Sequence, residues 1–278
     1  MTHTTRARLL ISLAAAALTS TAQAQKASAY TIRAGDTLRY TERTDARVEI
    51  DTPGGTAQMT SEHVATIAVA FTRADSARGW YESLLLRQTG PGDLRREPNT
   101  AGLLRQPYHL SVSPAGVLRA ATFPTIPKEI ADLTDLTRQF DDFFITLPRQ
   151  PLAVGVTWSD TLTSNRSAQP GGTLSSRNVR SYRVERDTVV AGLPAVVIRV
   201  DHEMRIDASS PLEGQSATAQ TSLQGTERGT AIFAPAAGRL LARNRAGTLQ
   251  GTFSMTSGIS RTDMPQRYEY TGTLALVP

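Results

Sequence analysis

The triplet Asp201-His202-Glu203 is the arrangement of residues best suited to chemistry in this sequence. A histidine beside two carboxylates could act as a general base if one carboxylate oriented its imidazole. Neighbouring side chains of a β-strand point to opposite faces, however, so the two acids share one face and His202 lies on the other. The pattern therefore favours a hydrogen-bonded core histidine, or a polar group that projects into a ligand cavity.

Other catalytic and metal-binding chemistry finds little support. The sequence contains no nucleophile elbow, zinc-protease, Walker, EF-hand or dinucleotide-binding motif. It has no cysteine, which excludes thiol nucleophiles, iron–sulfur clusters and cysteine-ligated zinc. Beyond the first 24 residues there are three histidines, His63, His109 and His202. We therefore expect no catalytic residue, no metal and no cofactor.

The first 24 residues have the pattern of a cleavable signal peptide. Two arginines precede the apolar run Leu9–Leu18, and the small-x-small sequence Ala22-Gln23-Ala24 follows. The run is too short to span a bilayer, which takes about 20 apolar residues. No cysteine follows it, so lipid attachment at a lipoprotein-type cysteine is excluded. The pattern predicts cleavage after Ala24 and export to the periplasm or the extracellular medium.

The charge of the sequence points to no particular partner. The net charge is +5, and removal of the first 24 residues, with two arginines and no acids, leaves +3. Arginine clusters such as Arg177, Arg180 and Arg183 could pair with phosphate. Acids interleave with them along most of the chain, which favours a solvated face with cross-strand ion pairs. Aromatic residues make up only 6% of the sequence, and the protein is predicted to be exported. For both reasons we do not expect nucleic acid as a partner.

Alternation of apolar and polar residues dominates the chain after residue 36. The clearest run is Ala195–Asp207, in which one parity is mostly apolar and the other is charged. Residues 38–51, 63–71 and 268–276 repeat the pattern, and breaks rich in glycine and proline separate such runs. This period is typical of half-buried antiparallel strands. We predict a mainly β protein with a curved antiparallel sheet or open half-barrel.

Residues 127–147 follow a different period. Their apolar residues recur at three- and four-residue steps, and Pro127 and Pro148 bracket the run. Acids lie in its first half, where the helix dipole favours them. The pattern predicts one amphipathic helix packed on the sheet, with the apolar stripe Ile130, Leu133, Leu136, Phe140, Phe143, Phe144 and Leu147.

The predicted helix separates two halves, residues 25–148 and 149–278, which we expect to form one continuous folded unit. Ala34–Leu38 and Val154–Trp158 open the halves with similar residues, at an offset of 120. Ser113–Leu118 and Ala234–Leu240 share a Pro-then-Gly turn. The sequence leaves open whether this is a true duplication or common turn chemistry.

These elements carry a family resemblance. The G-x-x-W strand start Gly155–Trp158, followed by the P-x-x-G-x-L turn Pro235–Leu240, resembles an uncharacterised exported bacterial β-rich family. At the level of the fold, the layout is similar to periplasmic half-barrels that carry lipoproteins or lipids. The resemblance implies an open sheet with a covering helix, and it implies no reaction, because fold does not determine function.

The leading hypothesis is therefore non-catalytic binding of a hydrophobic small molecule, lipid or acyl chain in a groove between sheet and helix. The charged polar parities, the sparse aromatics and the terminal Pro278 predict a protein that is not integral to a membrane. Two alternatives stay open: a structural or protein-interaction module with a closed core, and a hydrolase that uses Asp or Glu. The candidate groove residues are Phe140, Phe143, Phe144, Trp158, Val200, His202 and Met204.

Overall fold

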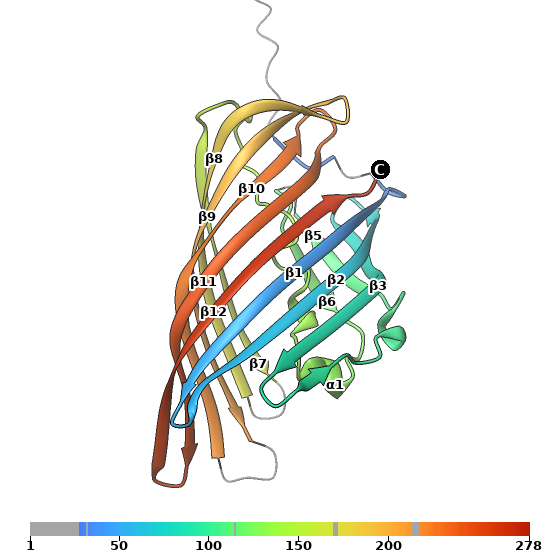
Figure 1. Ribbon diagram of the computed structural model, residues 1–278. Coiled ribbons are helices and arrows are strands. Elements are labelled where there is room, and N and C mark those ends of the chain that lie inside the picture. The colour runs from blue at the N-terminus through green and yellow to red at the C-terminus, as the bar shows by residue number, and fades with distance from the viewer. Residues whose placement is uncertain (1–27, 32, 114, 169–171, 213–216) are drawn as a thin grey trace, which may run out of the picture.

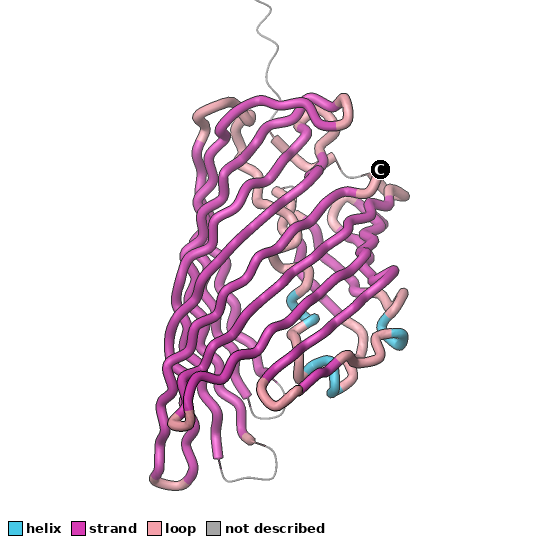
Figure 2. Tube along the Cα trace, viewed as in Figure 1, coloured by secondary structure: helices cyan, strands magenta, loops and turns pink. Residues whose placement is uncertain are grey.

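The computed structural model describes residues 28–278 except residues 32, 114, 169–171 and 213–216. The predicted signal peptide, residues 1–24, lies outside this described part. One antiparallel sheet of 12 strands dominates the structure (Figures 1 and 2). The strands are β1 (Thr37–Thr52), β2 (Gly55–Arg73), β3 (Ser76–Gly90), β4 (Leu94–Arg96), β5 (Tyr108–Val112), β6 (Leu118–Thr122), β7 (Thr157–Ala168), β8 (Gly172–Val190), β9 (Leu193–Pro211), β10 (Ala217–Ala234), β11 (Arg239–Ser257) and β12 (Ser260–Leu276).

The first and last strands are neighbours in the middle of the sheet. The spatial order is β6-β5-β3-β2-β1-β12-β11-β10-β9-β8-β7, with β4 paired to the end of β3. The β1–β12 register runs from Tyr40 opposite Leu276 to Ile50 opposite Gln266. The edges are β6 and β7, which are consecutive along the chain, and the described strands include no pairing between them. The sheet is therefore curved but not closed.

The strands follow the alternation of the sequence. In β9, Val196, Ile198 and Val200 are buried, whereas Arg199 and Glu203 are exposed. Both predicted halves contribute to the one sheet, and β12 of the second half pairs with β1 of the first. The predicted antiparallel, mainly β fold is confirmed. The proposed duplication stays a prediction.

The connection between the two edges, residues 123–156, runs along the hollow side of the sheet (Figure 1). We call it the crossing segment, and we call the sheet face that it covers the inner face. Aromatic contacts join the two: the Phe143 ring lies 5.3 Å from the Tyr40 ring, and the Phe140 ring lies 5.0 Å from the Tyr108 ring. The main hydrophobic core therefore forms between an irregular segment and the inner face.

The predicted helix over residues 127–147 is wrong. Within this range only α1 (Lys128–Ala131) is α-helical, and Leu136–Arg138 forms a 3₁₀ turn. Residues 143–145 are consecutive and all buried, so apolar side chains are needed in several directions rather than along one stripe. The Asp135 side chain accepts a hydrogen bond from the Thr137 backbone N–H and so starts a separate turn. A second 3₁₀ turn, Ala101–Leu103, lies between β4 and β5.

In the part of the chain that the structure describes, no helix combines the length and the apolar character needed to cross a bilayer.

Candidate functional site

Asp142, in the crossing segment, is the centre of an ionic cluster on the inner face. Arg180 of β8 and Arg243 of β11 donate to its carboxylate at 2.6 and 2.7 Å. Arg243 also donates to the Asp142 backbone carbonyl at 2.5 Å, and Arg245 Nη1 lies 3.5 Å from the carboxylate. Arg243 and Arg245 reach the same carboxylate because side chains two apart on a strand share a face.

Further groups of the inner face complete this cluster. Asp160 of β7 accepts two hydrogen bonds from the Arg180 guanidinium, at 2.6 and 2.5 Å. Glu227 of β10 accepts from Arg243 at 3.4 Å and from the Tyr270 hydroxyl of β12 at 2.6 Å. His202 Nδ1 of β9 lies 3.1 Å from the Glu227 carboxylate. The ionic cluster therefore ties the crossing segment to six adjacent strands, β7 to β12.

The electrostatics of the cluster favour fixed charges. Burial alone would raise the pKa of Asp142, but Arg243, His202, Arg180 and Arg245 outweigh it, and the pKa lies well below its usual range. Burial lowers the pKa of His202, and Asp142 and Glu227 oppose this only in part. A neutral His202 can meet Glu227 only as an Nδ1–H donor. Asp142 is thus ionised at neutral pH, and its ion pairs tie the crossing segment to β8 and β11.

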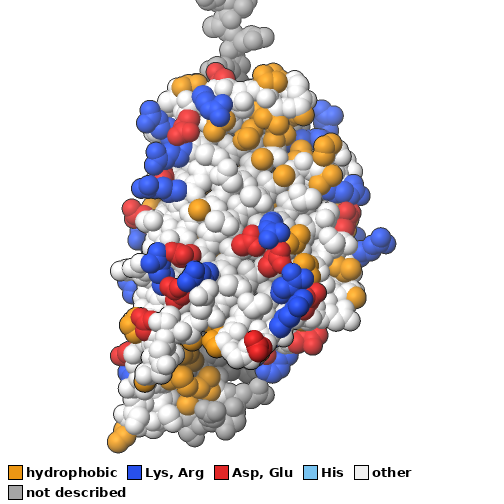
Figure 3. Space-filling view, viewed as in Figure 1, with side chains coloured by type: hydrophobic (Ala, Val, Ile, Leu, Met, Phe, Trp, Pro, Cys, Tyr) orange, Lys and Arg blue, Asp and Glu red, His pale blue; other side chains and the backbone are white. Residues whose placement is uncertain are grey.

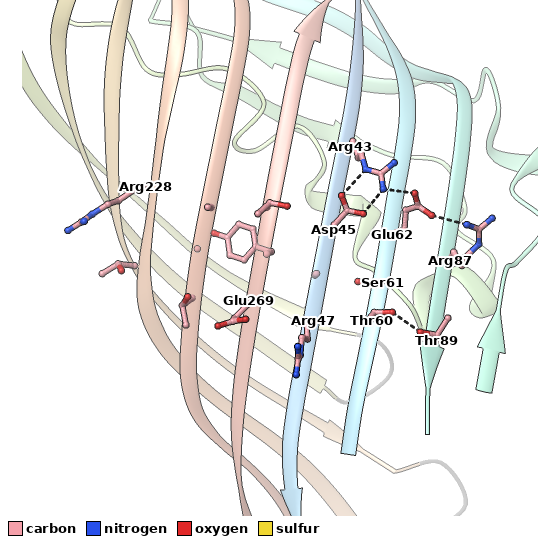
Figure 4. Close-up of a pocket in the computed structure, with 17 residues that line it drawn as sticks. Arg43, Asp45, Arg47, Thr60, Ser61, Glu62, Arg87, Thr89, Arg228 and Glu269 are labelled. Carbon is pink, nitrogen blue, oxygen red and sulfur yellow. Dashed lines mark hydrogen bonds and ion pairs between the residues drawn. The ribbon is translucent and has the colours of Figure 1, made fainter. Parts of the chain in front are cut away.

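A large hollow lies on the other, outer face of the sheet, across β10, β11, β12, β1, β2 and β3 (Figure 4). Its volume is about 980 Å³. Its arginines are already paired: Arg43 and Arg87 each lie 2.9 Å from the Glu62 carboxylate, and Arg228 lies 3.5 Å from Asp201. An open, solvated hollow whose cations are neutralised offers little to a charged ligand.

Similar pairing occurs elsewhere on the outer face, where blue and red side chains lie side by side in several groups (Figure 3). Arginines repeatedly pair with the acid two residues later on the same strand, as in Arg43–Asp45, Arg47–Glu49, Arg199–Asp201, Arg205–Asp207, Arg261–Asp263 and Arg267–Glu269. The described charges of the outer face therefore form local ion pairs, and the arginines around the hollow do not make an unpaired basic patch.

A second cavity lies between the crossing segment and the inner face, near the ends of β8, β9 and β10 that lie low in Figure 1, beside α1. Its volume is about 550 Å³. Its apolar lining consists of Phe123, Pro124, Ile126, Ala131, Leu136, Leu174, Ala208 and Ala219. The remaining lining residues are Thr125, Thr134, Thr137, Thr173, Ser209, Ser210, Thr221 and Asp135. We call this the inner cavity.

Small residues on paired strands leave this space open. Thr221 of β10 pairs with Ala208 of β9, and Ala219 pairs with Ser210. Elsewhere the inner face of β9 carries the larger side chains of Val196, Ile198 and Val200, which are buried in the core. Because small side chains end well short of the crossing segment, the gap persists at this end of the sheet.

The candidate groove residues from the sequence lie elsewhere. Phe140, Phe143, Phe144 and Val200 belong to the filled core, and His202 belongs to the ionic cluster. None of them lines the inner cavity.

The other two candidates are partly buried and also lie outside the inner cavity. Trp158 stacks on Tyr182 with ring centroids 4.9 Å apart, and its indole N–H donates to the Thr146 carbonyl at 2.7 Å. Met204 Sδ lies 3.7 Å from the Tyr270 hydroxyl. A groove role for the seven candidates stays a prediction. The sequence did not reveal the inner cavity because its signal, the small residues Ala208, Ser210, Ala219 and Thr221, is weak.

Comparisons with known proteins give remote likenesses. No protein-family model matches the chain, so the family resemblance is unconfirmed, and no curated protein matches it significantly. Neisserial surface protein A (NspA) is 10% identical with a TM-score of 0.24, covering 85% of this chain and 96% of that one. Pseudomonas aeruginosa OccK5 (OpdH) is 10% identical with a TM-score of 0.27, covering 87% and 99%. The translocator domain of autotransporter NalP from Neisseria meningitidis is 8% identical with a TM-score of 0.20, covering 88% and 89%.

These similar structures are outer-membrane β-barrel proteins. This finding contradicts the expectation that the chain is not integral to a membrane, and that expectation is withdrawn. TM-scores this low assign no function to the chain.

Proposed function

We propose that this is a non-catalytic protein of the cell envelope that binds an apolar small molecule, such as a lipid acyl chain, in the inner cavity. The observation that carries the proposal is the unfilled 550 Å³ space between the crossing segment and the inner face. Ligand pockets are typically about 300–1,000 Å³ and mostly apolar, with a few polar groups. The envelope location rests on the signal-peptide pattern of residues 1–24.

The lining of the inner cavity favours binding over catalysis. Its described lining residues include one carboxylate, Asp135, and no histidine, lysine or arginine. General acid–base or nucleophilic catalysis would need a second group within hydrogen-bond reach of the first. A hydrolase built on Asp142 and Glu227 finds no support either, because both carboxylates accept hydrogen bonds from Arg243.

Titration with N-phenyl-1-naphthylamine, an uncharged probe that fluoresces in apolar surroundings, tests the proposal. We expect saturable fluorescence with the wild-type protein. Ala219→Trp fills the inner cavity and should weaken binding at least tenfold. Gln220→Trp is the matched control: residue 220 is exposed on the opposite face of the same strand, so binding should stay at the wild-type level.

Absence of saturable binding by the wild-type protein would overturn the proposal in favour of a module with a closed core. Equal binding by the wild type and Ala219→Trp would also overturn it, because the probe would then bind outside the inner cavity. Far-ultraviolet circular dichroism of both variants establishes that each retains the β fold before the titrations are compared.

A further inference from the structure

We infer that the inner cavity selects an uncharged amphiphile, with a hydroxyl or ester head group, over a fatty acid or other anionic lipid. This inference rests on the proposed function and names the class of its ligand. The carrying observation is the charge of the lining. Among the described residues that line the cavity there is a single charge, that of Asp135, and it is negative.

An anionic head group would find no cationic partner among the described residues of this lining. The buried arginines of the ionic cluster pair with carboxylates: Arg180 with Asp142 and Asp160, and Arg243 with Asp142 and Glu227. Neither arginine lines the inner cavity. Burying a carboxylate or phosphate without a cation or a full set of donors is strongly unfavourable. The inner cavity therefore penalises an anionic head group that enters it.

The position of Asp135 extends this penalty to the entrance. Its side chain is exposed, and Phe123 beside the same cavity is 51% exposed, so both mark the solvent side of the lining. The Asp135 carboxylate accepts hydrogen bonds from the backbone N–H and the hydroxyl of Thr137. These bonds hold the negative charge in place, where it repels an anion that remains at the entrance.

The rest of the polar lining suits an uncharged head group. The polar lining residues include Thr134 on the crossing segment and, on the inner parity of the sheet, Ser210 of β9 and Thr221 of β10. A hydroxyl group can donate one hydrogen bond and accept others, which matches an alcohol or ester oxygen. The apolar residues of the cavity would then contact the hydrocarbon chain.

Competition between two ligands with the same acyl chain tests the inference. N-phenyl-1-naphthylamine bound to the intact protein is displaced with 1-monodecanoylglycerol or with decanoate at pH 8, below their critical micelle concentrations. We expect the monoglyceride to displace the probe at a concentration at least tenfold lower. Asp135→Asn should narrow this ratio severalfold by strengthening competition from decanoate, because asparagine keeps the hydrogen bond from Thr137 and loses the charge.

Asp132→Asn is the control, since Asp132 lies on the same segment, pairs with Lys128 and is not part of the cavity lining. It should leave the ratio unchanged. If the probe binds and decanoate competes as well as the monoglyceride, the inference is wrong and the proposed function stands. If the probe does not bind at all, both the proposed function and this inference are wrong.

Discussion

At the scale of single residues, the stability of the interior depends on buried charges, and removing the partner of such a charge is strongly destabilising. Arg180 and Arg243 have side chains only 4% and 5% exposed, and both donate to Asp142. Removing one member of a buried pair leaves the other charge desolvated without compensation, which is worse than never having buried the pair. Asp142 should therefore contribute more to stability than any of the exposed acids on the outer face.

We predict that Asp142→Asn lowers the free energy of unfolding by about 3 kcal/mol or more, because two buried arginines lose their shared anion. Urea denaturation followed by circular dichroism measures the change. Asp45→Asn is the matched control, since its pair with Arg43 is about half exposed and should contribute less than about 1 kcal/mol. Similar losses in the two variants would contradict the tethering role of Asp142.

Two histidines, the buried His202 and the partly buried His63, predict a pH dependence of stability. Burial lowers the pKa of His63 and of His202 below the ordinary value of 6.5. The unfolded chain therefore binds more protons than the folded one just below pH 6.5, and the free energy of unfolding falls as pH decreases. The contribution is fully present above about pH 6.5, whereas the contribution of Asp142, whose pKa is depressed, is lost only below about pH 4.

We expect denaturation midpoints in urea to decrease between pH 7 and pH 5. His63→Gln should flatten this dependence, because one of the two histidines with a lowered pKa is removed. His109→Gln is the control, since His109 is exposed on β5 and its replacement should leave the slope as in the wild type. Equal slopes for all three proteins would show that His63 does not contribute to the effect.

At the scale of elements, the crossing segment fits the sheet through close contacts at particular glycines. A Cβ on Gly79 of β3 would lie 2.3 Å from the Phe140 ring. We predict that Gly79→Ala lowers the free energy of unfolding by about 1–3 kcal/mol through overpacking. The double variant with Phe140→Leu should be more stable than the sum of the single changes implies, by about 0.5 kcal/mol or more.

Gly102→Ala is the control for the glycine change itself, because a Cβ there meets nothing within 4 Å. Thermal unfolding should show no loss of stability in this variant. Additive effects of Gly79→Ala and Phe140→Leu on stability would mean that the two residues are not in tight contact. That result would contradict the close packing of the crossing segment on β3.

The sequence could predict the strands but not their interior contacts. Alternation in residues such as Val196 to Glu203 places apolar and charged groups on opposite faces through local geometry alone. The periodicity of the crossing segment predicted a helix wrongly, because residues 143–145 are all buried by tertiary packing. The ionic cluster depends on the register of β7 to β12, which brings residues as distant as Asp142 and Arg243 together. No local pattern carries that information.

At the scale of the whole molecule, the pairing of β1 with β12 joins residues more than 200 positions apart, as with Tyr40 and Leu276. Such non-local pairings are costly to form early, because a long loop must close first. The central position of these two strands makes their pairing necessary for a continuous sheet. We therefore expect neither predicted half to be independent of the other, which stays a prediction.

The pairing of β1 with β12 has a consequence for the order of folding. Starting from β7, the sheet is a single up-and-down series through β12, then β1, and on to β6, with β4 as a side branch. A circular permutant that joins Pro278 to residue 28 by a short glycine–serine linker and opens between Ala153 and Val154, both exposed, would visit the path strands in their spatial order. Nearly every strand pairing would then be a hairpin between sequence neighbours. We expect stopped-flow refolding of this permutant to be at least tenfold faster than that of the natural arrangement, because the pairing of β1 with β12 has become local. An unchanged rate would place the folding barrier in the docking of residues 123–156 instead.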